Sequence, residues 1–136
     1  QPINPGRPID AKAQAVHGIT FEMLTKEPEW EVVAPKLQRV ISASEIIVAH
    51  NGLGFDMPFV THELKRAGLE VPEKKVVDTC VDGRWATPLG KIPNLRELCF
   101  ACNVEYDPDS AHAAEYDVDV MMKCFFHGYK KGFFRV

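Results

Sequence analysis

The sequence predicts an α/β fold, and three observations support this class. Two short runs of β-branched residues, at 45–49 and 76–77, have the composition of buried strands. Patterns with helical spacing precede, separate and follow these runs, as in folds whose helices alternate with strands. The chain has 136 residues, of which 46% are hydrophobic, so it can bury the core of one globular domain.

The first half of the chain contains a connector, two helical patterns and the first strand. Residues 1–10 include three prolines and one glycine, which indicates an extended connector. A short helix is expected at 20–24, with Thr20 as its N-cap. A longer helix, with Pro35 in its first turn, follows. Its apolar face is formed by Val33, Leu37, Val40 and Ile41. The strand at 45–49 then ends at His50.

The second half alternates in the same way. A helix with Pro58 in its first turn is expected to end at Gly68. The strand at 76–77 leads into a predicted helix that carries Val81 and Trp85, and a further helix is expected at 94–102. The last helix has the clearest pattern, with Ser110 as its expected cap. Its apolar face is formed by Ala114, Val118, Met121, Met122, Phe125 and Tyr129.

Charge and cysteine content narrow the function classes. Sixteen basic and nineteen acidic residues give a net charge of -3, so no overall basic field favours the wrapping of long duplex nucleic acid. The four cysteines lack the spacing of a secreted disulfide scaffold, which predicts reduced thiols and a cytoplasmic location. Two of them form Cys99-Phe-Ala-Cys102, which we interpret as core rather than as a zinc site. No apolar run has the length of a membrane span, so no membrane association is expected.

The number of predicted strands is small. Two strands covered by helices would leave unpaired edges and a small core. The chain also begins with Gln1 rather than Met. We therefore expect residues 1–136 to be a single domain that is N-terminally incomplete. A segment upstream of Gln1 or a second chain would supply the additional strands.

Asp117 is the first candidate functional residue. In the last helix it lies beside the apolar face, where a carboxylate needs a partner, and a divalent metal ion would satisfy it. His112, five residues earlier, cannot share this face in a regular helix, so we place it on the incoming loop or in the first turn. A histidine there could take a proton from an attacking water molecule. A capping or surface role for both residues is the alternative.

Asp56 is the second candidate carboxylate. It lies between the first strand and the helix that contains Pro58, where its alternative role is that of an N-cap. His50, Asn51 and Phe55 precede it in the segment His50-Asn-Gly-Leu-Gly-Phe-Asp56. A helix cap alone would not require these neighbours. Carboxylates and a histidine at such junctions are typical of a metal-dependent phosphodiesterase.

These segments resemble a known family. His50-Asn51-x-x-x-Phe55-Asp56 and His112-x-x-x-x-Asp117 are similar to the second and third motifs of the DEDDh exonucleases, the DnaQ-like 3'-5' exonucleases. Pro8-Ile9 and residues 16–20 resemble the family's segment just before its helices, and Val77-Asp78-Thr79 and residues 95–99 resemble the stretch between the two motifs, in the same order. Two features differ: three residues rather than two separate Asn51 from Phe55, and the family's first motif, an Asp-x-Glu on a strand, is absent from this chain.

The resemblance implies a ribonuclease-H-like exonuclease fold that lacks its N-terminal antiparallel strands, and an enzyme that uses two divalent ions, Mg²⁺ or Mn²⁺. It implies a 3'-5' exonuclease that releases nucleoside monophosphates from the 3' end of single-stranded DNA or RNA, with a DNA polymerase subunit as a candidate partner. By the same resemblance, Asp56 and Asp117 would be metal ligands and His112 the catalytic base. The remaining residues implied to contact substrate are Asn51, Phe55 and His17.

Other functions remain open from the sequence. The same fold could serve as a catalytically silent module that binds nucleic acid or another protein. An upstream segment carrying Asp-x-Glu would favour the enzyme, and an upstream segment without both acids would favour the silent module. A third alternative is an assembly in which another chain contributes the missing strands.

Overall fold

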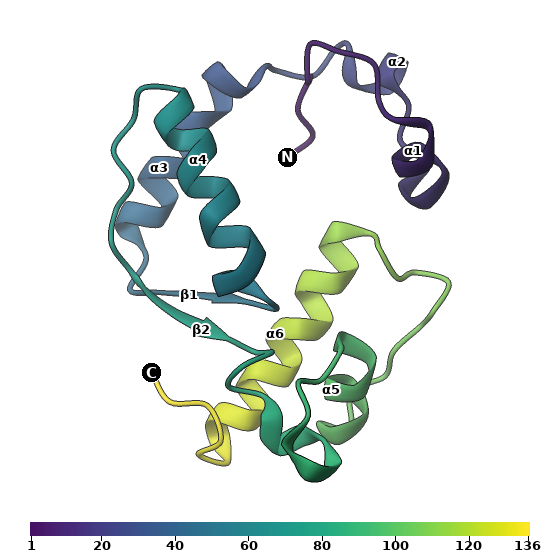
Figure 1. Cartoon of the computed structure of the whole chain (residues 1–136), viewed down its shortest axis with the longest axis vertical. Helices are drawn as coiled ribbons and strands as arrows, with labels where there is room; N and C mark the ends of the chain where they lie inside the picture. The colour runs from purple at the N-terminus through teal and green to yellow at the C-terminus, as the bar shows by residue number, and fades with distance from the viewer. The chain divides into compact units, whose positions relative to one another are not determined.

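A computed structural model describes residues 1–136 and confirms the α/β class (Figure 1). The chain forms two compact units, one made of residues 1–44 and 60–73 and the other of residues 45–59 and 74–136. The helices are α1 (Ala11–His17), α2 (Phe21–Leu24), α3 (Trp30–Ala43), α4 (Met57–Arg66), α5 (Leu95–Ala101) and α6 (Ala114–Lys130). The strands are β1 (Ile46–Ala49) and β2 (Lys75–Asp78), and the shorter helical turns are η1 (Gly52–Asp56), η2 (Arg84–Ala86) and η3 (Pro88–Gly90).

The second unit contains the sheet. β1 and β2 are parallel, with Ile46 opposite Lys75 and Ala49 opposite Asp78. Because this register aligns the carboxyl ends of both strands, the residues that follow them meet. The ring Nδ1 of His50 lies 2.8 Å from Thr79 Oγ1. The sheet thus brings together two segments that are about thirty residues apart in the sequence.

Helices α5 and α6 form the core of this unit with the strands. α6 contacts both α5 and β1. The side chains of the main cluster are apolar and buried: Val77, Leu98, Cys99, Cys102, Val120, Cys124, Phe125 and Phe134. Phe134 reaches the cluster because Gly128 has no side chain; a Cβ there would lie 2.5 Å from the Phe134 ring. All four cysteines are unpaired and buried, as predicted for reduced thiols.

The last helix exists as predicted, but its buried face is different. Val118 is 54% exposed and Tyr129 is 48% exposed, although both belong to the predicted apolar face. Met121 and Phe125 of the predicted face are buried, as expected, and the other buried residues of the helix are Val120, Cys124 and Gly128. The small residues Cys124 and Gly128 allow close approach of the neighbouring elements, which rotates the helix toward them. Ser110 is not the cap: Ala113 occupies that position, and the Ser110 hydroxyl donates to Asp107.

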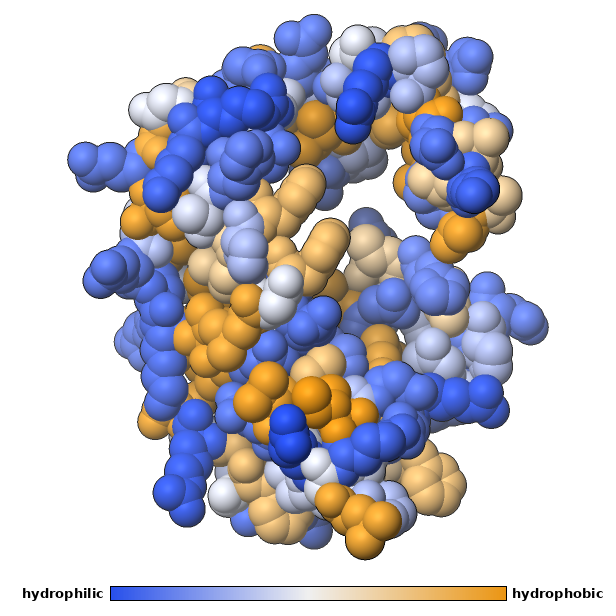
Figure 2. Space-filling view, in the orientation of Figure 1, coloured by the Kyte–Doolittle hydropathy of each residue, from blue (hydrophilic) through white to orange (hydrophobic).

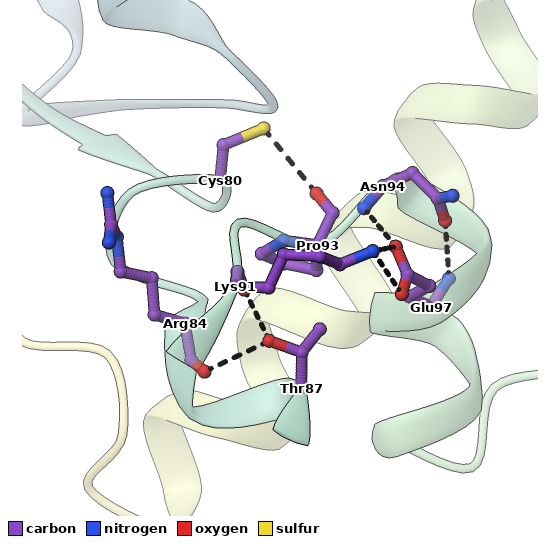
Figure 3. Close-up of polar contacts among 7 residues, drawn as sticks. All are labelled: Cys80, Arg84, Thr87, Lys91, Pro93, Asn94 and Glu97. Atoms are coloured by element: carbon purple, nitrogen blue, oxygen red, sulfur yellow. Dashed lines mark hydrogen bonds and ion pairs between the residues drawn. The ribbon is translucent and has the colours of Figure 1, made fainter. Parts of the chain in front are cut away.

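The predicted helix that carries Val81 and Trp85 is wrong. The chain forms turns after β2, followed by η2 and η3. Gly83 packs its Cα against the carbonyl oxygen of Thr79, a contact that leaves no room for a Cβ. The Thr87 hydroxyl contacts the carbonyl oxygens of Arg84 and Lys91 and so closes this compact segment (Figure 3). Pro88 then prevents continuation of a regular helix.

α5 begins at the predicted place because its first turn has a complete cap. The Asn94 side chain accepts a hydrogen bond from the Glu97 N–H at 2.8 Å, and the Glu97 carboxylate accepts one from the Asn94 N–H at 3.1 Å. Lys91 Nζ lies 2.8 Å from the same carboxylate (Figure 3). This reciprocal arrangement satisfies N–H groups that would otherwise lack partners.

The first unit contains α1, α2, α3 and most of α4. Trp30 at the start of α3 donates its indole N–H to the Glu63 carbonyl of α4 at 2.8 Å. Since α3 begins at Trp30, Pro35 lies in its second turn rather than in the predicted first turn. α4 ends before Gly68, whose φ of 77° requires the left-handed region. The cap of α2 by Thr20 is confirmed.

α1 was not predicted from the sequence. It buries no residue, whereas apolar periodicity marks helices that bury one face. Its signals are its ends: the Asp10 side chain accepts from the Lys12 N–H at 2.8 Å, and Gly18 adopts a left-handed conformation at the C-cap. Apolar side chains are exposed elsewhere too, among them Leu89 and Phe100, and Figure 2 shows apolar groups among hydrophilic ones on one face. None of the helices has both the length and the apolar character needed to cross a lipid bilayer.

Candidate active site

Asp56 is carried by a π-helical turn between β1 and α4. Asn51 leaves β1 in a left-handed conformation, with φ of 65°, and its carbonyl accepts from the Phe55 N–H at 2.9 Å. A Cβ on Gly52 would lie 2.6 Å from the Ala49 Cβ, so glycine permits this approach. A π-helical turn has one residue more than an α-helical turn, which accommodates the three residues between Asn51 and Phe55.

The surroundings of Asp56 disfavour its charge. Burial raises the pKa of Asp56, the negative charge of Asp78 raises it further, and His50 opposes both effects. Burial likewise lowers the pKa of His50, against the opposing charges of Asp78 and Asp56. The positive charge of a bound cation would oppose both effects on Asp56. The N-cap role for Asp56 is not seen, since Asp56 is the last residue of η1, which runs directly into α4.

Asp78 was missed as a site residue from the sequence. It ends β2 and is fully buried. Its carboxylate accepts hydrogen bonds from the N–H groups of Asn51 at 3.0 Å, Leu53 at 3.0 Å and Cys80 at 2.9 Å. A strand that ends in an aspartate was visible in the sequence, but nothing local indicated which segment this aspartate would contact.

Asp117 and His112 lie at the start of α6. His112 is exposed on the incoming loop, as predicted, with a left-handed φ of 71°. Asp117 is in the first turn of the helix, and its Oδ1 is buried without a hydrogen-bond partner. Burial raises the pKa of Tyr106 and of Cys99 most, and the negative charge of Asp117 raises both further. An unpaired carboxylate oxygen beside a phenol and a thiol is a site that a cation would stabilise.

The loop before α6 is attached to the helix through Tyr116. The Asp107 N–H donates to the Tyr116 hydroxyl at 2.5 Å, and the rings of Tyr106 and Tyr116 lie 6.1 Å apart. Asp107 in turn caps the following turn, accepting from the Asp109 N–H and from the Ser110 hydroxyl. These contacts define the backbone that leads to His112.

The remaining predicted residues lie on the surface. Phe55 is 61% exposed and stacks on Phe59, with ring centres 5.8 Å apart. The Asn51 side-chain oxygen lies over Gly54, where it would clash with a Cβ. His17 is exposed at the end of α1 in the first unit, and its Nδ1 accepts from the Ile19 N–H at 2.9 Å. The structure thus brings Asp56 together with His50 and Asp78, and Asp117 together with Tyr106 and Cys99.

The family is established by comparison with known proteins. The model of the RNase_T family, described as exonuclease, matches residues 1–125. The chain belongs to this exonuclease family. The family includes the DnaQ-like 3'-5' exonucleases, so the predicted membership is confirmed.

Relatives of this exonuclease domain include polymerase subunits. It is 34% identical to the DNA polymerase III subunit epsilon of Haemophilus influenzae over 122 residues, which cover 88% of this chain and 46% of the relative. It is 30% identical to the PolC-type DNA polymerase III of Mycoplasma genitalium over 123 residues, which cover 89% of this chain and 8% of the relative. It is 32% identical to the 3'-5' exonuclease DinG of Bacillus subtilis over 118 residues, which cover 87% of this chain and 12% of the relative. The chain therefore spans less than half the length of these relatives.

The fold has a counterpart among solved structures. The exonuclease domain matches exonuclease X, determined in complex with 5' overhanging duplex DNA, with a TM-score of 0.57 and 24% sequence identity. The match covers 96% of this chain and 72% of exonuclease X. This confirms the predicted ribonuclease-H-like exonuclease fold.

The donor chemistry of the exonuclease domain partly fits a divalent metal. The unpartnered Asp117 oxygen and the half-buried Asp56 carboxylate are hard oxygen donors, which Mg²⁺ and Mn²⁺ prefer. No three histidine, cysteine, aspartate or glutamate side chains come together in a way that could hold a metal ion. The convergence of Asp56 and Asp117 on a shared cation stays a prediction.

Proposed function

We propose that this chain contributes to a metal-dependent 3'-5' exonuclease that releases nucleoside monophosphates from the 3' end of single-stranded nucleic acid. The observation that carries the proposal is the buried Asp117 oxygen without a partner, in a chain that belongs to the exonuclease family. A carboxylate left in this state is costly unless a cation completes its surroundings. The raised pKa of Asp56 supports the same need at the second motif.

Asp56 and Asp117 would hold the divalent ions, Mg²⁺ or Mn²⁺. Bound there, two such ions supply an activated water and stabilise the oxygen that leaves the phosphate. Since the described residues contain no group of three ligands, we propose that further carboxylates come from a segment or a chain outside residues 1–136. In this proposal, residues 1–136 are one N-terminally incomplete exonuclease domain, and the family match across both compact units supports this.

His112 would act as the base. It is exposed on the loop that enters α6, and no hydrogen bond of its ring restrains it. An imidazole in this position can approach a water molecule near Asp117 and accept its proton. The left-handed backbone at His112 sets the direction in which the side chain leaves the loop.

The substrate would be gripped at its terminal nucleotide. Phe55 and Phe59 stack with an interplanar angle of 8° and expose 61% and 56% of their surfaces, so Phe55 next to Asp56 offers a face for a base. We propose Asn51 and His17 as further substrate contacts. DNA and RNA both fit this chemistry. The relatives named DNA polymerase III support a polymerase as partner and a role in proofreading, and the four unpaired cysteines support a cytoplasmic location.

A catalytically silent module of the same fold is the second candidate. It is favoured by one observation, the absence of any three-ligand metal group among residues 1–136. Such a module would retain the exposed aromatic pair and bind nucleic acid without cutting it.

Nucleotide release from a 5'-labelled single-stranded oligonucleotide, with Mg²⁺ or Mn²⁺ added and with both removed by a chelator, tests the proposal. We expect Asp117→Asn to reduce release by more than about 100-fold, because metal ligation supplies several kcal/mol of transition-state stabilisation. Asp119→Asn is the matched control, since this exposed neighbour only pairs with Lys123 at 2.9 Å. Binding of the oligonucleotide without metal-dependent release, in the protein together with its natural flanking segments, would favour the silent module.

A further inference from the structure

The turn that carries Asp56 is attached to the end of β2 through the side chain of Asp78. This side chain is fully buried. Its Oδ1 accepts from the N–H groups of Asn51 and Cys80, and its Oδ2 accepts from the N–H of Leu53. Three N–H donors therefore replace the water that a buried carboxylate would lose, and charge-assisted bonds of this kind are stronger than those between neutral groups.

The register of the sheet places the Asp78 carboxylate next to the turn that follows β1. Ala49, the last residue of β1, lies opposite Asp78, the last residue of β2. The backbone beyond Ala49 turns sharply, and the N–H groups of Asn51 and Leu53 both point toward Asp78. Successive N–H groups that converge on one anion form a fixed dipolar cradle. Here the anion is the protein's own carboxylate.

We propose that Asp78 is a positioning residue of the exonuclease site. Its carboxylate fixes the backbone of residues 51–56 and thereby the direction in which Asp56 leaves the turn. Asp78 is no ligand itself, because its oxygens are occupied by N–H donors and it has no exposed surface. The inference rests on the proposed function, since the direction of Asp56 matters for catalysis only if Asp56 holds a metal ion.

Asp78→Asn tests this role with little change in shape. The carboxamide keeps one oxygen but turns an NH₂ group toward a backbone N–H that previously had an acceptor, so one of the bonds to the turn is lost. Asp82→Asn is the matched control. Asp82 lies four residues later and is exposed, and its side chain accepts only from the Asp78 N–H. The substitution removes the same charge without changing a contact to the turn.

Three measurements on both variants decide the question. In Asp78→Asn we expect amide hydrogen exchange of Leu53 and Phe55 to accelerate at least tenfold while amides of β1 and β2 keep their protection. Affinity for Mn²⁺ and the rate of nucleotide release should each fall by about 10- to 100-fold, as for groups that orient metal ligands. Asp82→Asn should match the unchanged protein in all three. Unchanged exchange in Asp78→Asn would overturn the proposal, as would faster exchange with undiminished Mn²⁺ affinity.

Failure of the proposed function can be told apart from failure of this inference. If the unchanged protein, together with its natural flanking segments, neither binds Mn²⁺ nor releases nucleotides, the proposed function fails, whereas amide exchange in the turn still tests whether Asp78 holds it. If Asp78→Asn loses its sheet protection as well, an ester in place of the Leu53 amide removes one donor and leaves the carboxylate intact. Unaltered exchange of Phe55 in that ester variant would overturn the inference.

Discussion

Among single residues, Asp56 should affect how the free energy of unfolding depends on pH. Burial and Asp78 raise the pKa of Asp56 above its value in the unfolded chain, so the folded state binds the proton more strongly. Stability contributed by this group is present below the unfolded pKa and is lost as pH rises through the folded pKa. We therefore expect Asp56→Asn to be more stable than the unchanged protein at neutral pH in a chelator, with no difference near about pH 3. Urea unfolding at both pH values measures this, and a difference of the same size at both would contradict the assignment.

Loss of the proposed base, His112, should affect the reaction rate but not metal binding. We expect His112→Ala to slow nucleotide release by about 10²- to 10⁴-fold, the usual contribution of a positioned base, while Mn²⁺ affinity stays unchanged. His127→Ala, on the last turn of α6, controls for the loss of a ring elsewhere on that helix. Undiminished nucleotide release in His112→Ala would exclude His112 as the base.

Local motifs were sufficient to choose candidate site residues. Asp56, Asp117 and His112 could be chosen from the sequence because each lies at an element boundary with characteristic neighbours. Asp78 could not, because its role depends on the register that sets Ala49 beside it, a pairing between segments far apart in the chain. Whether the carboxylates of Asp56 and Asp117 share a cation also depends on long-range packing and stays a prediction.

Among the helices, the cap of α5 and the expected cap of α6 differ in the hydrogen bonds that they make. Asn94 makes a reciprocal cap with Glu97, whereas the side chain of Ser110, the expected cap of α6, donates to Asp107. We expect Asn94→Ala to lower the free energy of unfolding by about 1 kcal/mol, the typical cost of a lost N-cap, and Ser110→Ala to change it by less than about 0.5 kcal/mol. Thermal or urea unfolding of the two variants measures both. A larger loss for Ser110→Ala than for Asn94→Ala would contradict these assignments.

The errors in predicting elements have two physical causes. The segment after β2 is not an α-helix because Gly83 packs on the Thr79 carbonyl and the Thr87 hydroxyl closes the turn, contacts that helical periodicity does not record. The buried face of α6 is rotated because close approach at Gly128 admits Phe134, and a glycine contributes nothing to an apolar pattern. Elements were thus predictable where burial is periodic, and were not where small residues set the packing.

At the scale of the whole molecule, the two compact units bury very different amounts of apolar surface. The buried apolar side chains of the first unit are Ala34, Ile41 and Leu64, and α1 buries none, whereas the second unit contains the aromatic and cysteine cluster around α6. Because local opening requires less free energy where fewer apolar contacts are lost, the units should open separately.

Native-state hydrogen exchange measures this opening residue by residue. We expect amides of α1 to exchange fastest, those of α3 to be intermediate, and those of β2 and the middle of α6 to exchange only through global unfolding. Added Mn²⁺ should then slow exchange in η1 and in the first turn of α6, because an ion held by Asp56 and Asp117 stabilises the states in which both are ordered. The amides of α1 serve as the internal control, since this helix carries no proposed ligand. Protection that rises equally in α1 and α6 would show that the ion does not act through the proposed carboxylates.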